Sequence, residues 1–83
     1  MVDVVAVTVL SGFRMRLRFD DGAERELDVR QFLHGPVFEP LVSDRAAFEA
    51  VRVDPELGTI VWPSGADTDP YVLYDASTPT VLG

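Results

Sequence analysis

The sequence contains no cysteine and no lysine, and it has a single histidine, His34. Without cysteine there can be no disulfide bond, no thiolate metal ligand and no cysteine nucleophile. One histidine cannot supply a histidine-based metal cluster within one chain. A Gly-rich phosphate loop, a helix-turn-helix pattern and a Ser-His-Asp set are also missing. The sequence therefore favours a protein that is not an enzyme, with no catalytic residues, no metal and no cofactor.

The charge is strongly one-sided, because 14 acidic residues outnumber 7 arginines and give a net charge of −7. Such a domain is poorly suited to the phosphate backbone of nucleic acids, which needs clustered positive charge. No run approaches the roughly 20 apolar residues of a membrane span, and the first residues lack the basic segment of a signal peptide. We expect a cytoplasmic protein that contacts neither nucleic acid directly nor a membrane. The lysine-free, Arg-rich composition is typical of GC-rich bacterial genomes.

The length and hydrophobic content fit one small globular domain. Apolar residues make up 47% of the 83 positions, which is ordinary for a folded protein. A core of this size leaves a net stability of roughly a few kcal/mol, so a protein partner is one way to gain more. We expect a single domain over residues 1–76 and a loose tail over 77–83.

The N-terminal half predicts a three-stranded antiparallel meander. Residues 2–10 are rich in β-branched side chains, residues 13–19 alternate apolar side chains with arginine, and residues 23–29 form the third strand. A three-residue loop at 20–22 pairs opposite charges across the last two strands and places Gly22 at the left-handed position of a G1 bulge. The expected pairs are Arg18 with Glu24, Arg16 with Glu26, Arg14 with Asp28, Met15 with Leu27 and Phe13 with Val29.

The first strand is harder to register. A two-residue turn at 11–12 places these side chains beside the buried face: Val4, Ala6, Thr8 and Leu10. Val5, Val7 and Val9 then lie on the arginine face, where a solvated surface rarely carries three valines in a row. Either the arginine stems cover them or another molecule packs there. We interpret Val5, Val7 and Val9 as a candidate partner interface.

The second half predicts short helices and a second hairpin. A helical turn over 30–33 is capped by Asp28, a helix over 45–51 is capped by Asp44, and a closing helix begins at Asp69-Pro70. Strands at 52–54 and 59–62 form the hairpin, and residues 38–41 are expected to be irregular. The fold class is α+β, with an N-terminal meander, two or three short helices, a second short β-hairpin and a C-terminal helical turn.

A few residues in this half have both a functional and a plain structural interpretation. His34 precedes Gly-Pro at a helix end, where histidine serves the helix dipole, and a catalytic role would need an acidic residue beside it in a cleft. Residues 65–69 resemble a calcium loop but lack its distal glutamate. Trp62 and Asp67 are a candidate ligand pocket, although a tryptophan on a short strand is most often a core residue.

The stretch Gly58-Thr-Ile-Val-Trp-Pro-Ser-Gly-Ala-Asp67 is the most distinctive in the chain. It resembles the bacterial family called domain of unknown function 2442, and the resemblance covers residues 2–75. Thr68 departs from the apolar residue expected after Asp67. The other matching positions are residues 19–22, Asp28, residues 38–41, Phe48, Pro70 and residues 73–74.

The resemblance implies a small α+β fold with an N-terminal antiparallel sheet. It also implies that some members of the family are fused to a helix-turn-helix domain. Others are encoded beside a second small protein in what look like toxin–antitoxin pairs. No catalytic residues are established for the family. Our first hypothesis is therefore an interaction module that binds a protein partner, antitoxin-like or a regulatory accessory, with a homodimer as a further expectation. The alternative is a small-molecule or effector-sensing domain of a transcriptional regulatory system, with its pocket near Trp62 and Asp67.

Overall fold

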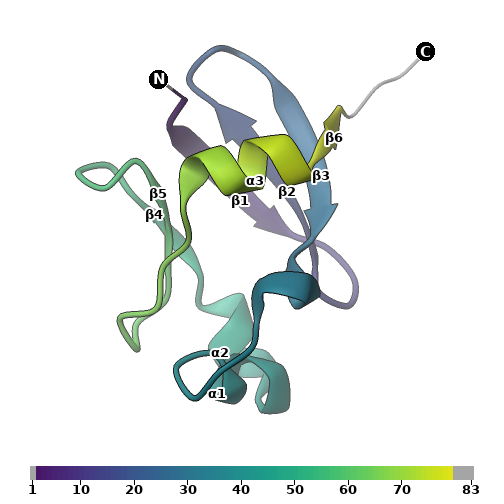
Figure 1. Ribbon diagram of the computed structural model, residues 1–83, viewed down its shortest axis with the longest axis vertical. Coiled ribbons are helices and arrows are strands. Elements are labelled where there is room, and N and C mark those ends of the chain that lie inside the picture. The colour runs from purple at the N-terminus through teal and green to yellow at the C-terminus, as the bar shows by residue number, and fades with distance from the viewer. Residues whose placement is uncertain (1, 80–83) are drawn as a thin grey trace.

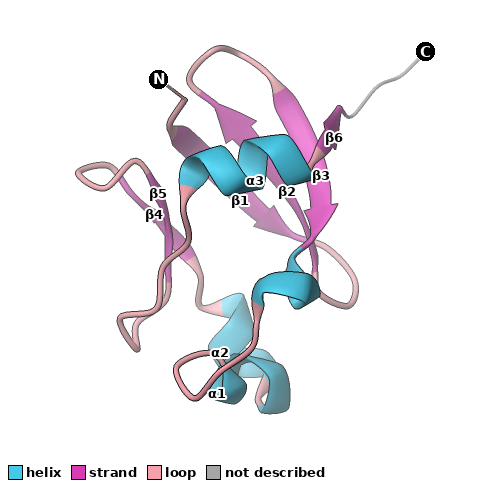
Figure 2. Ribbon diagram, viewed as in Figure 1, coloured by secondary structure: helices cyan, strands magenta, loops and turns pink. Residues whose placement is uncertain are grey.

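The computed structural model describes residues 2–79 and has an α+β architecture (Figures 1 and 2). One antiparallel sheet has the strand order β1-β2-β3-β6, and a separate hairpin pairs β4 with β5. The strands are β1 (Val4–Val9), β2 (Arg14–Phe19), β3 (Glu24–Asp28), β4 (Arg52–Asp54), β5 (Thr59–Val61) and β6 (Thr78–Pro79). The helices are the 3₁₀ helix η1 (Val29–Phe32), α1 (Glu39–Ser43), α2 (Arg45–Glu49) and α3 (Pro70–Ala76). The predicted α+β class, with its meander, second hairpin and C-terminal helix, is confirmed.

The register of β2 and β3 matches the prediction from charge. The paired residues are Arg14 with Asp28, Met15 with Leu27, Arg16 with Glu26, Leu17 with Arg25 and Arg18 with Glu24. The backbone N–H of Phe19 donates to the carbonyl of Ala23 over 2.9 Å, which leaves a three-residue loop. Gly22 has a φ of 89°, the left-handed conformation that this loop requires and that glycine adopts without strain.

The predicted register of β1 is wrong by one residue. The N–H of Leu10 donates to the carbonyl of Arg14 over 2.8 Å, so the turn contains three residues, 11–13, rather than two. Because side chains alternate along a strand, a shift of one residue exchanges the two faces. Val7 and Val9 therefore lie opposite Leu17 and Met15 on the core side.

The other half of β1 shows the same exchange. Ala6 pairs with Arg18 and Thr8 pairs with Arg16, so these two small residues face away from the core. A bulge between Val4 and Ala6 then moves the register by one, and Val4 returns to the core with 1% of its surface exposed. Val5, at the bulge, is left 50% exposed.

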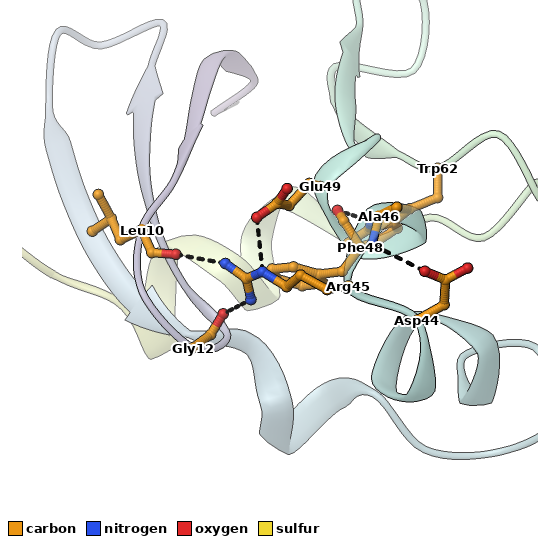
Figure 3. Close-up of polar contacts among 8 residues, drawn as sticks. All are labelled: Leu10, Gly12, Asp44, Arg45, Ala46, Phe48, Glu49 and Trp62. Atoms are coloured by element: carbon orange, nitrogen blue, oxygen red, sulfur yellow. Dashed lines mark hydrogen bonds and ion pairs between the residues drawn. The ribbon is translucent and has the colours of Figure 1, made fainter.

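Arg45 explains why the β1–β2 turn takes its longer form (Figure 3). Its guanidinium donates to the carbonyl of Leu10 over 2.9 Å and also to the carbonyl of Gly12. The Nε atom donates to Glu49 over 2.8 Å, which orients the group. Arg45 is the first residue of α2, which begins after the predicted cap, since the Asp44 side chain accepts from the N–H of Ala46. A side chain distant in sequence thus binds the carbonyls of the turn.

Residues 38–41 were expected to be irregular, and that prediction is wrong. Helix α1 begins at Glu39 and carries Pro40 within its first turn. Proline is tolerated there because the first turn has no intrahelical use for its missing N–H. The helix buries Leu41, which is 1% exposed.

The core lies between one face of the sheet, α3, the β4–β5 hairpin and the short helices at the other end of the molecule (Figure 1). Trp62 is at its centre, 1% exposed, and its indole N–H donates to the carbonyl of Phe48 over 2.9 Å. The buried apolar residues are Val4, Met15, Leu17, Phe19, Leu27, Val29, Leu33, Leu41, Phe48, Ile60, Trp62, Ala66 and Leu73.

Arg25 ties the end of the described chain to the sheet. It lies opposite Leu17 on the core side, and its guanidinium lies 4.3 Å from the ring centre of Tyr74. Nε donates to Ser77 Oγ over 2.7 Å and Nη2 donates to the Ser77 carbonyl over 2.8 Å. Beyond the boundary expected at residue 76, β6 pairs with β3, while residues 80–83 of the expected tail lie outside the described residues.

Candidate functional site

The face of the sheet opposite the core is exposed and charged, and we call it the outer face. Two rows across β1, β2 and β3 each contain a small neutral residue, an arginine and a glutamate. One row is Thr8, Arg16 and Glu26, and the next is Ala6, Arg18 and Glu24. The arginines therefore run along the middle strand, with carboxylates on one side and almost no side chain on the other.

The charges on the outer face are paired at different strengths. Glu26 binds two arginines, with 3.1 Å from Arg14 Nη2 and 2.9 Å from Arg16 Nη2. Hydrogen bonds from Arg16 and then Arg14 lower the pKa of the Glu26 carboxyl. Arg18 is 3.4 Å from Glu24, and its side chain is 59% exposed. Arg18 therefore has the weakest of these pairs and the freest guanidinium.

A trough of about 390 Å³ runs beside the arginines over β1. It exists because Ala6 and Thr8 are short, so nothing fills the space next to the longer side chains of β2. Its lining residues are Ala6, Thr8, Arg16, Arg18 and Glu24. The outer face thus has a hollow with a neutral floor and a cationic wall.

A second cleft, of about 380 Å³, lies between η1 and α1. It brings His34 into the same cleft as Glu39, which the hydrolase interpretation of His34 would require. The His34 ring, however, contacts the carbonyl of Gln31, and Ser43 Oγ donates to the carbonyl of Glu39 over 3.3 Å. A nucleophilic serine must instead hydrogen bond its base. The lining residues are Arg30, Leu33, His34, Gly35, Glu39, Val42 and Ser43.

The structure does not bring the three valines of the candidate interface together. Val7 and Val9 are half-buried against the core, and only Val5 is exposed. The stripe was inferred from the two-residue turn, and it disappears with the longer turn. Ala6 and Thr8 occupy the outer-face positions instead.

The two residues of the candidate ligand pocket differ in burial and in the residues that they contact. Trp62 is buried and packs against Phe48, with 6.2 Å between the ring centres, whereas Asp67 is exposed and forms a β-bridge with Val61. Neither cleft described above is lined by Trp62 or Asp67. Within residues 2–79, no three His, Asp or Glu side chains gather closely enough to hold a metal ion.

Sequence reasoning missed the roles of three arginines. Arg45 has a usable signal, an Arg-Glu pair four residues apart after a capping aspartate, but nothing local points to the turn that it binds. Arg25 is the one arginine of the meander on the core side, which the confirmed register already implies. Arg30 lines the second cleft, which depends on the unpredicted helix α1.

The fold and surface define a small α+β domain with one face of its sheet in the core and the other face bare and charged. The chain belongs to the family described as protein of unknown function (DUF2442), whose model matches residues 4–79. The resemblance seen in the sequence is thereby confirmed. No curated protein and no solved structure matches the chain. Among the described residues, no helix has the length and apolar character to cross a bilayer.

Proposed function

We propose that the protein is a non-enzymatic interaction module that binds a protein partner, either as the antitoxin-like half of a pair or as a regulatory accessory. The outer face is the observation that carries this proposal. Three strands present ordered rows of charge there, while every large apolar side chain of β2 lies on the other side in the core. A face with this order, which no element of residues 2–79 covers, is suited to a partner of matching charge pattern.

The chemistry of the outer face indicates what the partner presents. Arginine is enriched at protein interfaces because its planar group binds carboxylates with two hydrogen bonds. Arg18 has donors to spare, and the trough beside it accepts a side chain without a clash. The partner therefore places a carboxylate over the trough and cationic groups toward the glutamates of β3.

The test fills the trough without breaking the ion pairs. Ala6→Gln adds bulk on the outer face, and Ala46→Gln adds the same atoms at an exposed position on α2. Each variant is co-expressed with the product of the neighbouring gene and analysed by size-exclusion chromatography with light scattering, and the Kd is measured by calorimetry. Ala6→Gln should weaken the complex by about tenfold or more, whereas Ala46→Gln should leave it unchanged.

Light scattering of the protein alone tests the homodimer at the same time, since a second copy can occupy the same face. The proposal is wrong if the chain stays monomeric and the neighbouring product does not bind. It is also wrong about the surface if Ala6→Gln binds as tightly as the wild type.

A further inference from the structure

The cleft between η1 and α1 is formed by a sharp reversal of the chain. Helix η1 ends at Phe32, and Gly35 adopts a φ of 91°, which returns the chain on itself. The carbonyl of Gly35 accepts from the N–H groups of Phe38 and Glu39, each over 3.1 Å, and these bonds fix the start of α1. The reversal places Arg30 and His34 on one wall, and Glu39 and Val42 on the other (residues lining the cleft).

The two walls carry opposite charges that do not neutralise each other. Neither Arg30 nor Glu39 takes part in the ion pairs formed within residues 2–79. Arg30 Nη1 donates to the carbonyl of Leu33 over 3.1 Å, which uses one of its five N–H donors and holds the group in place. The cleft therefore offers a fixed cation and a separate carboxylate.

The remaining lining is mixed, since the polar residues His34 and Ser43 and the small Gly35 lie beside the aliphatic Leu33 and Val42. Leu33 is 2% exposed, so the half-buried Val42 provides most of the aliphatic surface in the cleft. A volume of about 380 Å³ is at the lower end of the range for small-molecule sites, roughly 300–1,000 Å³. That volume suits a ligand of few atoms better than a nucleotide.

We propose that the cleft between η1 and α1 binds a free α-amino acid with an aliphatic side chain. Arg30 holds the carboxylate, Glu39 holds the ammonium group, and Val42 contacts the side chain. The charge of the whole molecule selects for this class, because a net charge of −7 repels simple anions while a zwitterion feels no net repulsion. A simple cation is disfavoured in turn, because the Arg30 guanidinium in the cleft repels it.

The site is on a different part of the molecule from the outer face, so it tests independently of the proposed partner surface. L-Leucine is titrated into uniformly ¹⁵N-labelled protein, and amide and Arg side-chain shifts are followed by NMR. In a solvated cleft each ionic contact contributes little, so we expect a Kd of about 1 mM with shifts concentrated at residues 30–43.

Two blocked ligands separate the charged contacts. N-acetyl-leucine lacks the ammonium group and leucine amide lacks the carboxylate, and each should bind about tenfold more weakly than leucine. Equal binding of N-acetyl-leucine would overturn the proposal, because it would show an anion site without Glu39. The absence of any shift at about ten times the expected Kd would overturn it as well.

Matched variants assign the contacts to residues. Arg30→Gln and Glu39→Gln should each weaken leucine binding by about tenfold, whereas Arg52→Gln and Glu56→Gln, at exposed positions outside the cleft, should not. The ¹⁵N spectrum of each variant reports whether it is folded. If Arg30→Gln misfolds, Glu39→Gln with leucine amide gives the second readout, since one group is then missing from each of the two ion pairs and the two losses should add. Equal affinities for Arg30→Gln and Arg52→Gln would contradict the assignment.

Discussion

Arg45 shows how one side chain can set the geometry of a distant turn. Its guanidinium binds the carbonyls of Leu10 and Gly12, 33 to 35 residues earlier in the chain, and the guanidinium carbon lies 5.2 Å from the centre of the Phe48 ring. Turn carbonyls that have no strand partner would otherwise rely on water. Arg45 thus links α2 to the meander through backbone carbonyls. Any residue at position 10 or 12 would provide such a carbonyl.

We expect Arg45→Met to lower the free energy of unfolding by about 1–2 kcal/mol, because it removes charged hydrogen bonds and keeps most of the stem. Urea denaturation followed by circular dichroism measures the change. Arg52→Met is the matched control, since Arg52 is exposed on β4 and joins no ion pair within residues 2–79; its effect should stay within about 0.5 kcal/mol. Equal effects of the two substitutions would show that the hydrogen bonds from Arg45 to the turn carbonyls do not stabilise the fold.

At the scale of elements, the most informative strand is β1. Local pairs of charged and apolar residues, together with Gly22, predicted the register of β2 and β3, because both strands and their loop lie within residues 14–28. The turn before β2 has no such local information, since turns at 11–12 and 11–13 are both acceptable, and the side chain that binds the observed turn, Arg45, is distant in sequence. Residues 38–41 were expected to be irregular, whereas Pro40 lies in the first turn of α1, where proline is tolerated.

The observed register of β1 predicts unequal effects for two reciprocal substitutions at neighbouring positions. Val9→Thr places a hydroxyl on the core side and should cost about 1 kcal/mol of unfolding free energy. Thr8→Val replaces a hydroxyl on the outer face and should change stability by less than about 0.5 kcal/mol. Chemical denaturation of both variants decides the matter, because a two-residue turn would exchange the two results.

For the molecule as a whole, the sequence predicted the fold class and the family better than the site. The charge pairs of the outer face followed from the confirmed register, but the trough did not, because it requires the small residues of β1 on that side. The cleft between η1 and α1 could not be anticipated without α1. The trough depends on contacts between segments far apart in the chain, which local patterns do not encode, whereas the cleft lies within residues 30–43 and was missed together with α1.

One long-range contact of this kind joins the β2–β3 loop to the C-terminal helix. Asp21 accepts from the N–H of Ala23 and from the Tyr74 hydroxyl, each over 2.9 Å. These bonds, the backbone bond first, lower the pKa of Asp21, and the bond to Asp21 raises the pKa of Tyr74. Tyr74 also packs edge-on against Phe19, with ring centres 4.8 Å apart. The contact therefore combines α3, the loop and the core.

The two pKa shifts predict how this contact responds to pH. A lowered folded-state pKa means that Asp21 stabilises the fold fully above about pH 4, and that this contribution is lost as the pH falls. A raised pKa means that Tyr74 contributes fully below about pH 10 and loses its contribution as the pH rises. Acid also relieves the repulsion within a chain of net charge −7, so the Tm of the wild type alone mixes two effects.

The difference in Tm between the wild type and Asp21→Asn isolates the contact: it should be largest near neutral pH and shrink below about pH 4. Asp75→Asn, an exposed change of the same charge on α3, should show no such closing gap, and a gap for Asp21→Asn that persists at low pH would show that the charge of Asp21 does not stabilise the fold.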